Sequence, residues 1–312
     1  MSSNNFNWCF IGAGNTARSV AVEMTAIRSR SHKIVSVYDR EKMEATSFAL
    51  FYGGLVYGTI EEAVSAPEVN AVYISEEEID LHYEIAKKCI LLKKPVLIEK
   101  PMTADYSQAA ELYELAKEND VYFSSTTWEW FKPVFAKIRE WIAAGYIGDI
   151  KKVDIKYAKP NNPLKPLSAN KAGALVSVGT FPITSCTNIF GCPLSVECTS
   201  EYDNGIDISD KLILKYDGFN CNIDISFKNY SGRETATVTG TQGIISVPLF
   251  HQYIRAKLMS NTKHETTRNF QRNVNSFDIV ANEINQGMKV SEFLPPENVL
   301  NVIKIINQCK NK

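Results

Sequence analysis

The residues near the N-terminus that are best suited to chemistry form a glycine-rich loop, GAGNTA, at positions 12–17. Gly12 permits a tight turn, Gly14 lets the backbone approach a pyrophosphate, and Ala17 keeps the following helix close to its strand. A second predicted strand ends in Asp39. In dinucleotide-binding folds an acidic side chain at the end of this strand accepts hydrogen bonds from the ribose hydroxyls. We therefore expect a dinucleotide site that includes Gly12, Gly14, Asn15, Thr16, Ala17 and Asp39.

Two neighbouring residues bear on which dinucleotide is bound. The Asp39 carboxylate would repel a 2′-phosphate and favours NAD, whereas the Arg40 guanidinium could accommodate that phosphate and favours NADP. Arg40 fits a solvated helix start equally well. The sequence thus predicts NAD or NADP as cofactor, with NAD slightly favoured by Asp39.

A lysine at a strand end is the first candidate for proton transfer. The segment PVLIEKPMT places Glu99 and Lys100 at the carboxyl end of a predicted strand, before a proline that holds Lys100 extended. Ligands of open α/β sheets bind outside such strand ends, so we expect Ser75, Glu99 and Lys100 to border the cofactor, with Lys100 facing the nicotinamide. The alternative is a lysine that only pairs with Glu99 or a phosphate.

These residues can form one site only if the carboxyl ends of their strands lie at the same edge of a sheet. In residues 1–124, short apolar segments alternate with helical segments, which is typical of a doubly wound parallel Rossmann sheet. From residue 125 the pattern becomes a helix beginning at Pro133, then alternating strands that include a hairpin turning on Asp217-Gly218. The predicted fold class is α/β, followed in residues 125–312 by an α+β substrate domain with an open, mainly antiparallel sheet. Its C-terminal helix is a candidate for packing back on the first domain.

Composition narrows the range of partners. The 312 residues are 45% hydrophobic and 22% charged, with a net charge of -1, which gives no reason to expect nucleic acid or an anionic membrane as partner. No apolar stretch approaches the roughly 20 residues that span a bilayer, so a cytoplasmic protein is expected. The seven cysteines are scattered without a CxxC pair, so neither a disulfide framework nor a metal site is expected.

Three segments together resemble the Gfo/Idh/MocA oxidoreductases, the group of glucose-fructose oxidoreductase, inositol dehydrogenase and dimeric dihydrodiol dehydrogenase. They are GAGNTA, AVYISEEEIDLHYEIAKKCILLKKPVLIEKPMT and AGALVSVGTFPITSCTNIFG, and the Glu-Lys-Pro element at residues 99–101 is the most specific part. The resemblance implies a homodimer formed through the C-terminal sheet and NAD(P)-dependent chemistry on sugars, cyclitols or related alcohols. It also implies that Lys100 binds the substrate hydroxyl and assists proton transfer.

The second signature of that family is altered in this chain. The family carries an Asp and a His or Tyr one helical turn apart beside the substrate, and here Ser177 and Phe181 occupy those positions. Neither side chain relays a proton at neutral pH. Lys100 is therefore the remaining proton-transfer residue, Ser177 and Phe181 are expected to line the pocket, and Glu129 is the nearest replacement acid.

Two further features lie near the predicted strand ends. Glu76, Glu77 and Glu78 replace a Thr-Pro-Asn type loop of the family, and they would either oppose an anionic cofactor or form a solvated helix start. His82 stands where the family commonly has a histidine that serves packing or cofactor contacts, so we expect a structural role for it rather than a catalytic one. Trp128, Trp130 and Phe131 follow the first domain and fit either packing or substrate stacking.

The sequence therefore predicts an NAD(P)-dependent oxidoreductase that acts on a sugar, cyclitol, diol or related carbonyl compound or alcohol by hydride transfer. The alternative is a non-catalytic homologue that binds a dinucleotide or a sugar as a sensor. A glycoside hydrolase that uses bound NAD transiently is a third reading.

Overall fold

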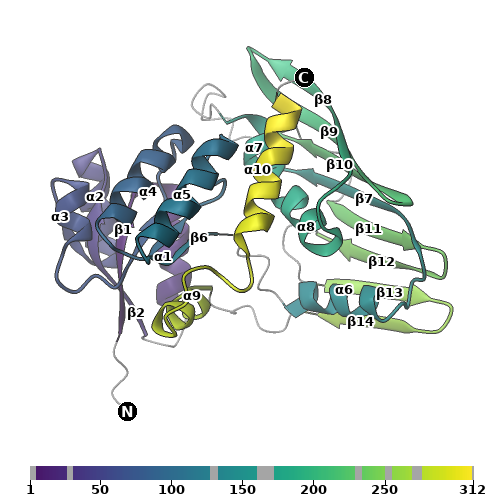
Figure 1. Cartoon of the computed structure of the whole chain (residues 1–312), viewed down its shortest axis with the longest axis horizontal. Coiled ribbons are helices and arrows are strands. Elements are labelled where there is room, and N and C mark those ends of the chain that lie inside the picture. Colours follow the sequence, from purple (N-terminus) through teal and green to yellow (C-terminus); the bar gives the residue numbers. More distant parts are fainter. Residues whose placement is uncertain are drawn as a thin grey trace. The chain divides into compact units, whose positions relative to one another are not determined.

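A computed structural model of the chain (Figure 1) describes residues 5–26, 31–126, 133–159, 172–228, 234–249, 255–268 and 276–310. The chain separates into two units. The first contains residues Met1–Thr127 and Asn273–Pro296, and the second contains Trp128–Arg272 and Glu297–Lys312. Among the described residues, no helix has both the length and the apolar character needed to cross a membrane.

The first unit is built on six parallel strands in the order β3-β2-β1-β4-β5-β6. Their apolar runs are buried on both faces, as in the wholly buried AVYI of β4, which is the pattern expected of parallel sheets covered by helices. The strand order reverses between β1 and β4, and open α/β sheets bind ligands at that point. The strands are β1 (Phe6–Ile11), β2 (His32–Tyr38), β3 (Leu55–Val56), β4 (Ala71–Ile74), β5 (Val96–Ile98) and β6 (Phe123–Ser125).

Side-chain caps fix where two helices of this unit begin. The Thr59 hydroxyl accepts a hydrogen bond from Glu62 N at 3.2 Å and so caps the helix that begins at Ile60. The Asp105 carboxylate accepts one from Gln108 N at 3.0 Å. The helices are α1 (Asn15–Ala26), α2 (Lys42–Tyr52), α3 (Ile60–Val64), the 3-10 turn η1 (Ile79–Leu81), α4 (His82–Leu91), α5 (Tyr106–Glu118) and α9 (Ser276–Asn285).

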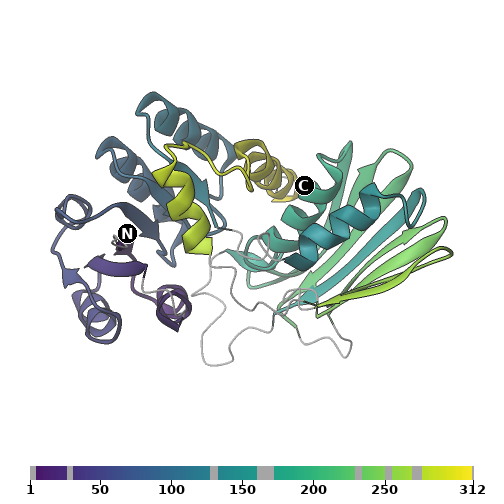
Figure 2. The same ribbon diagram turned by 90° about the horizontal axis from the view of Figure 1, so that it is seen from below.

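The late helix α9 completes the core of the first unit, and Figure 2 shows it among the elements of that unit. The Phe277 ring packs edge-on against Trp8, with 4.8 Å between ring centroids. Tyr122 donates a hydrogen bond of 2.6 Å to Glu283, and both side chains are buried. A segment distant in sequence is therefore needed to cover the start of β1.

The second unit is built on eight strands in the order β14-β13-β12-β11-β7-β10-β9-β8. Only β7 and β10 pair in parallel; the other neighbours are antiparallel. The elements are α6 (Pro133–Ala143), β7 (Ile150–Ala158), α7 (Gly173–Ser177), α8 (Thr180–Phe190), β8 (Ser195–Asp203), β9 (Ile206–Tyr216), β10 (Phe219–Ser226), β11 (Thr235–Gly240), β12 (Gly243–Pro248), β13 (Arg255–Ser260), β14 (His264–Arg268) and α10 (Pro296–Lys310).

The predicted fold class is confirmed, and so is the predicted hairpin. Tyr216 pairs with Phe219 across a two-residue turn, in which Gly218 has a φ of 80°. On β9 and β10 alternate side chains such as Leu212, Leu214 and Ile223 are buried. The strands β8 and β14 were not predicted, and they form the two edges of the sheet.

Candidate dinucleotide and active site

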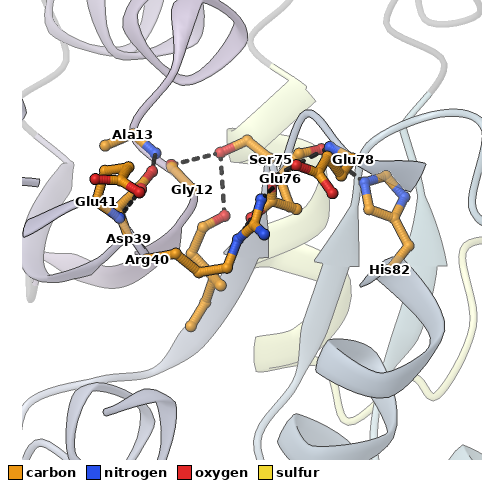
Figure 3. Close-up of polar contacts among 10 residues, drawn as sticks. Gly12, Ala13, Asp39, Arg40, Glu41, Ser75, Glu76, Glu78 and His82 are labelled. Atoms are coloured by element: carbon orange, nitrogen blue, oxygen red, sulfur yellow. Dashed lines mark hydrogen bonds and ion pairs between the residues drawn. The ribbon is translucent and has the colours of Figure 1, made fainter. Parts of the chain in front are cut away.

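The glycine loop lies directly against the loop that follows β4. Gly12 has a φ of 91°, and a Cβ atom at this position would come within 2.6 Å of Glu76 N. The Ser75 hydroxyl donates to the Gly12 carbonyl at 2.9 Å (Figure 3). Because this backbone conformation and this close approach both exclude a side chain, glycine is required here.

The Asp39 carboxylate is oriented by two backbone amides. Its Oδ2 accepts from Ala13 N at 2.7 Å, and its Oδ1 accepts from Glu41 N at 2.8 Å (Figure 3). A carboxylate offers about four lone-pair directions, so these two bonds leave capacity to accept hydroxyl donors. Asp39 is therefore fixed beside the glycine loop and keeps the hydrogen-bonding chemistry expected of a ribose-binding residue.

Arg40 faces the acidic loop after β4. Its Nη2 donates to Glu78 Oε1 at 2.8 Å, and its Nε lies 3.5 Å from Glu76 Oε2 (Figure 3). The hydrogen bond with Glu78 raises the pKa of Arg40 above its ordinary value. The guanidinium is thus held by two carboxylates of the protein itself.

The third glutamate of this loop turns to the start of α1. Glu77 Oε1 accepts a hydrogen bond of 2.9 Å from Asn15 N, the first residue of that helix. Each of the three glutamates thus contacts a residue that was predicted to bind the cofactor or to select it.

Lys100 lies two residues after the end of β5, and its backbone amide donates to two side chains. Lys100 N donates to Thr126 Oγ1 at 3.1 Å and to Glu99 Oε2 at 3.2 Å. The other oxygen of Glu99 accepts a bond of 2.5 Å from the buried Tyr73 hydroxyl. Burial raises the pKa of Tyr73 well above its usual value, and the Glu99 carboxylate adds to that effect. Glu99 therefore anchors the lysine backbone to the sheet.

His82 ties the lysine loop to the acidic loop. Its Nδ1 lies 3.1 Å from the Pro101 carbonyl and its Nε2 lies 2.8 Å from the Glu76 carbonyl. The ring is only 1% exposed, and Figure 3 shows it beside Glu76 and Glu78. These backbone contacts fit the structural role expected of His82 rather than a catalytic one.

The two altered signature residues belong to the second unit, whereas Lys100 belongs to the first. Phe181 is 3% exposed, and its ring packs edge-on against Tyr157 at 5.6 Å. Ser177 is half-buried at the end of α7. Between them the helical path widens, because Gly179 N donates to the Ala174 carbonyl, five residues back. Glu129, Trp128, Trp130 and Phe131 lie outside the described residues.

A pair of acidic residues on β9 was missed from the sequence. Asp207 Oδ2 accepts from Leu175 N at 2.6 Å. Asp210 is 1% exposed, and among the residues that the structure describes neither of its carboxylate oxygens has a hydrogen-bond partner. Burial raises the pKa of Asp210 to about 7, and the neighbouring Asp207 adds to the shift. Its position in the strand could have revealed Asp210, because it lies two and four residues before Leu212 and Leu214 and so falls on the same buried face of β9.

Curated relatives of this chain include dehydrogenases of dihydrodiols. The trans-1,2-dihydrobenzene-1,2-diol dehydrogenase of Xenopus laevis is 26% identical over 250 residues, covering 78% of this chain and 75% of the relative. The enzyme of the same name from Homo sapiens is 24% identical over 251 residues, covering 77% of this chain and 73% of the relative.

Solved structures share the fold over nearly the full length. KijD10, a 3-ketoreductase from Actinomadura kijaniata in complex with TDP-benzene and NADP, superposes with a TM-score of 0.84 at 20% identity, covering 98% of this chain and 97% of that one. The UDP-N-acetylglucosamine 3-dehydrogenase GnnA from Acidithiobacillus ferrooxidans gives a TM-score of 0.83 at 17% identity, with coverage of 98% and 97%.

Family models match both units of the chain. Residues 6–127 match the oxidoreductase family with an NAD-binding Rossmann fold, and residues 135–246 match the GFO/IDH/MocA C-terminal domain. Together with the six-stranded parallel sheet and the larger, mainly antiparallel one, these matches show that the chain belongs to the GFO/IDH/MocA oxidoreductase family.

Proposed function

We propose that this chain is an NAD(P)-dependent oxidoreductase that transfers a hydride between the dinucleotide and a small alcohol or carbonyl compound, with Lys100 as the proton-transfer residue. Diols, cyclitols and sugars are the proposed substrate class. In this proposal residues 1–124 bind the dinucleotide, and residues 125–312 bind the substrate and form a homodimer through the open sheet.

One observation carries the proposal. The glycine loop after β1, Asp39 after β2 and Lys100 after β5 all follow the carboxyl ends of parallel strands, on the edge where open α/β sheets bind ligands. A nicotinamide bound there would accept or donate the hydride, and an ammonium group beside the substrate oxygen would exchange the accompanying proton.

The relatives support the proposed chemistry. The curated relatives are named as dehydrogenases of a cyclic trans-diol, and two structural neighbours are named as a 3-ketoreductase and a sugar-nucleotide 3-dehydrogenase. Hydride exchange at a secondary alcohol or ketone of a ring is common to all three names. We therefore take ring alcohols and the corresponding ketones as the first substrates to test.

The experiment that tests the proposal has two parts. NADH and NADPH are titrated against the protein by nucleotide fluorescence, and then cyclitols, sugars, trans-diols and aldehydes are screened for absorbance change of the cofactor. Binding with turnover of at least one compound is the expected result. If neither nucleotide binds at millimolar concentration, the proposal fails.

A non-catalytic sensor is the second candidate, and Phe181 favours it. This residue stands at the family's His or Tyr position and is packed against Tyr157. A sensor would bind the nucleotide but turn over no compound in the screen. In that case Lys100 would serve ligand binding alone.

We propose NAD as the preferred cofactor because the Arg40 guanidinium is already paired with Glu76 and Glu78. A 2′-phosphate could use this guanidinium only by replacing Glu78 or Glu76, and Asp39 would repel it. Replacing both glutamates, as E76Q/E78Q, is therefore expected to lower the ratio of the NADPH Kd to the NADH Kd by about tenfold or more. Isothermal titration with both nucleotides measures the ratio.

The triple variant R40A/E76Q/E78Q is the matched control, because it removes the guanidinium that the glutamates release. In this variant the gain in NADPH affinity should disappear. An equal ratio in the wild type and in E76Q/E78Q would show that Arg40 does not take part in cofactor selection.

A further inference from the structure

The contact between Glu77 and the start of α1 brings an anion into the glycine loop. Glu77 Oε1 accepts from Asn15 N at 2.9 Å. A Cβ atom placed on Gly14 would lie 2.5 Å from the same oxygen and 2.8 Å from Glu77 Cδ. The carboxylate therefore lies directly over the second glycine of the loop and on the first backbone amide of the helix.

This position is where the proposed cofactor would carry its charge. In dinucleotide-binding folds the pyrophosphate approaches the second glycine of the loop and accepts hydrogen bonds from the helix N-terminus. Helix α1 has no acidic residue in its own first turn, so Glu77 supplies the negative charge that its N-terminal dipole favours. Glu77 thus makes the interaction that a phosphate oxygen would make.

The backbone around Glu77 is fixed, so that the side chain has to move if the position is to be vacated. The Glu76 carbonyl is held by His82 Nε2, and Glu78 N donates to Glu76 Oε1 at 3.1 Å. Rotation of the Glu77 side chain is then the simplest way to free Asn15 N. Two anions cannot share one amide and one glycine surface without strong repulsion.

We propose that Glu77 occupies the pyrophosphate position of the cofactor site, and that a dinucleotide binds only by displacing it. Glu77 then sets the dinucleotide affinity of this chain. The inference rests on the proposed function, because it concerns the same cofactor site.

The test compares NADH binding by the wild type, E77Q and E77A. The Gln variant removes the charge, and the Ala variant also removes the atoms that cover Gly14. Both are expected to lower the NADH Kd by about tenfold or more, since like charges at contact distance are strongly unfavourable. The advantage over the wild type should shrink at high salt, which screens the repulsion.

The control variant is E114Q, which removes one negative charge from an exposed position on α5 of the same unit. It should keep the wild-type Kd. A second measurement needs no cofactor: the Asn15 amide resonance in a two-dimensional NMR spectrum should shift in E77Q and stay unchanged in E114Q. Thermal unfolding confirms that each variant is folded.

The outcomes separate the two proposals. If the wild type and all variants bind NADH with the same Kd, or if E77A binds more weakly, the role of Glu77 is refuted and the proposed function stands. If no variant and no wild-type protein binds either nucleotide, the proposed function fails and this inference fails with it. An Asn15 resonance that is unchanged in E77Q would refute the contact itself.

Discussion

Replacing Lys100 by methionine is expected to lower kcat by about 10² to 10⁴, the usual contribution of a positioned acid or base. Methionine preserves most of the side-chain length but cannot exchange a proton. The bonds to Thr126 and Glu99 come from the backbone amide of residue 100, so they survive the substitution. The Kd for NADH should therefore stay nearly unchanged, and the loss should appear in kcat. Steady-state kinetics on the best substrate of the screen, together with a nucleotide titration, measure both quantities.

Chemical rescue makes this prediction specific. A small primary amine such as methylamine should restore part of the activity of K100A, because it can enter the space of the missing ammonium group. Lys117, which is 80% exposed on α5, provides the control variant K117M, with wild-type kinetics expected. Full turnover by K100M would show that another group transfers the proton.

The second large expected effect is a pH dependence of the free energy of unfolding, caused by the buried carboxyl of Asp210. Its pKa is raised from 3.8 to about 7 in the folded protein, chiefly by burial. Between these two values the unfolded chain binds fewer protons than the folded one, so the free energy of unfolding falls as the pH rises. The variant D210N should lack this fall.

Denaturant unfolding of the wild type and D210N from pH 4 to pH 8 tests this expectation. At low pH the two proteins should have similar stability, because the neutral carboxyl of the wild type and the amide of the variant are both buried without a hydrogen-bond partner among the described residues. The stability difference should then move in favour of D210N by a few kcal/mol as the pH rises. The control D217N changes an exposed residue of the β9–β10 turn and should follow the wild-type profile. Parallel profiles for D210N and the wild type would contradict a raised pKa.

Patterns within one element were predictable, whereas the two edge strands of the second sheet were not. The strands β9 and β10 are central and bury alternate side chains, which made their period visible. In the edge strand β8, only Val196 has less than a tenth of its surface exposed. In the edge strand β14, no side chain is buried to that extent. Because edge strands need no apolar row, their Glu and Thr residues resemble loop sequence. The parallel strands of the first unit were easier to predict from the sequence, since they are largely apolar.

The candidate site was predictable where one short segment sets the geometry. Gly12 and Asp39 were identified from spacing, and the structure places both at strand ends. The contact of Glu77 with Asn15 joins residues 62 positions apart and depends on β1 and β4 being neighbours. Local spacing contains no such information. The glutamates could be noted from the sequence, but which of them faces the glycine loop and which faces Arg40 required the fold.

The return of α9 to the first unit has a consequence for biosynthesis. Tyr122 and Glu283 are 161 residues apart, and Phe277 covers Trp8, so the first unit is complete only after almost the whole chain has been translated. Domains usually fold in order as they leave the ribosome. Here the N-terminal unit has to wait for residues 273–296, which come after the larger part of the second unit. A nascent chain that stalls before residue 276 would leave the Trp8 surface uncovered, as a binding site for chaperones.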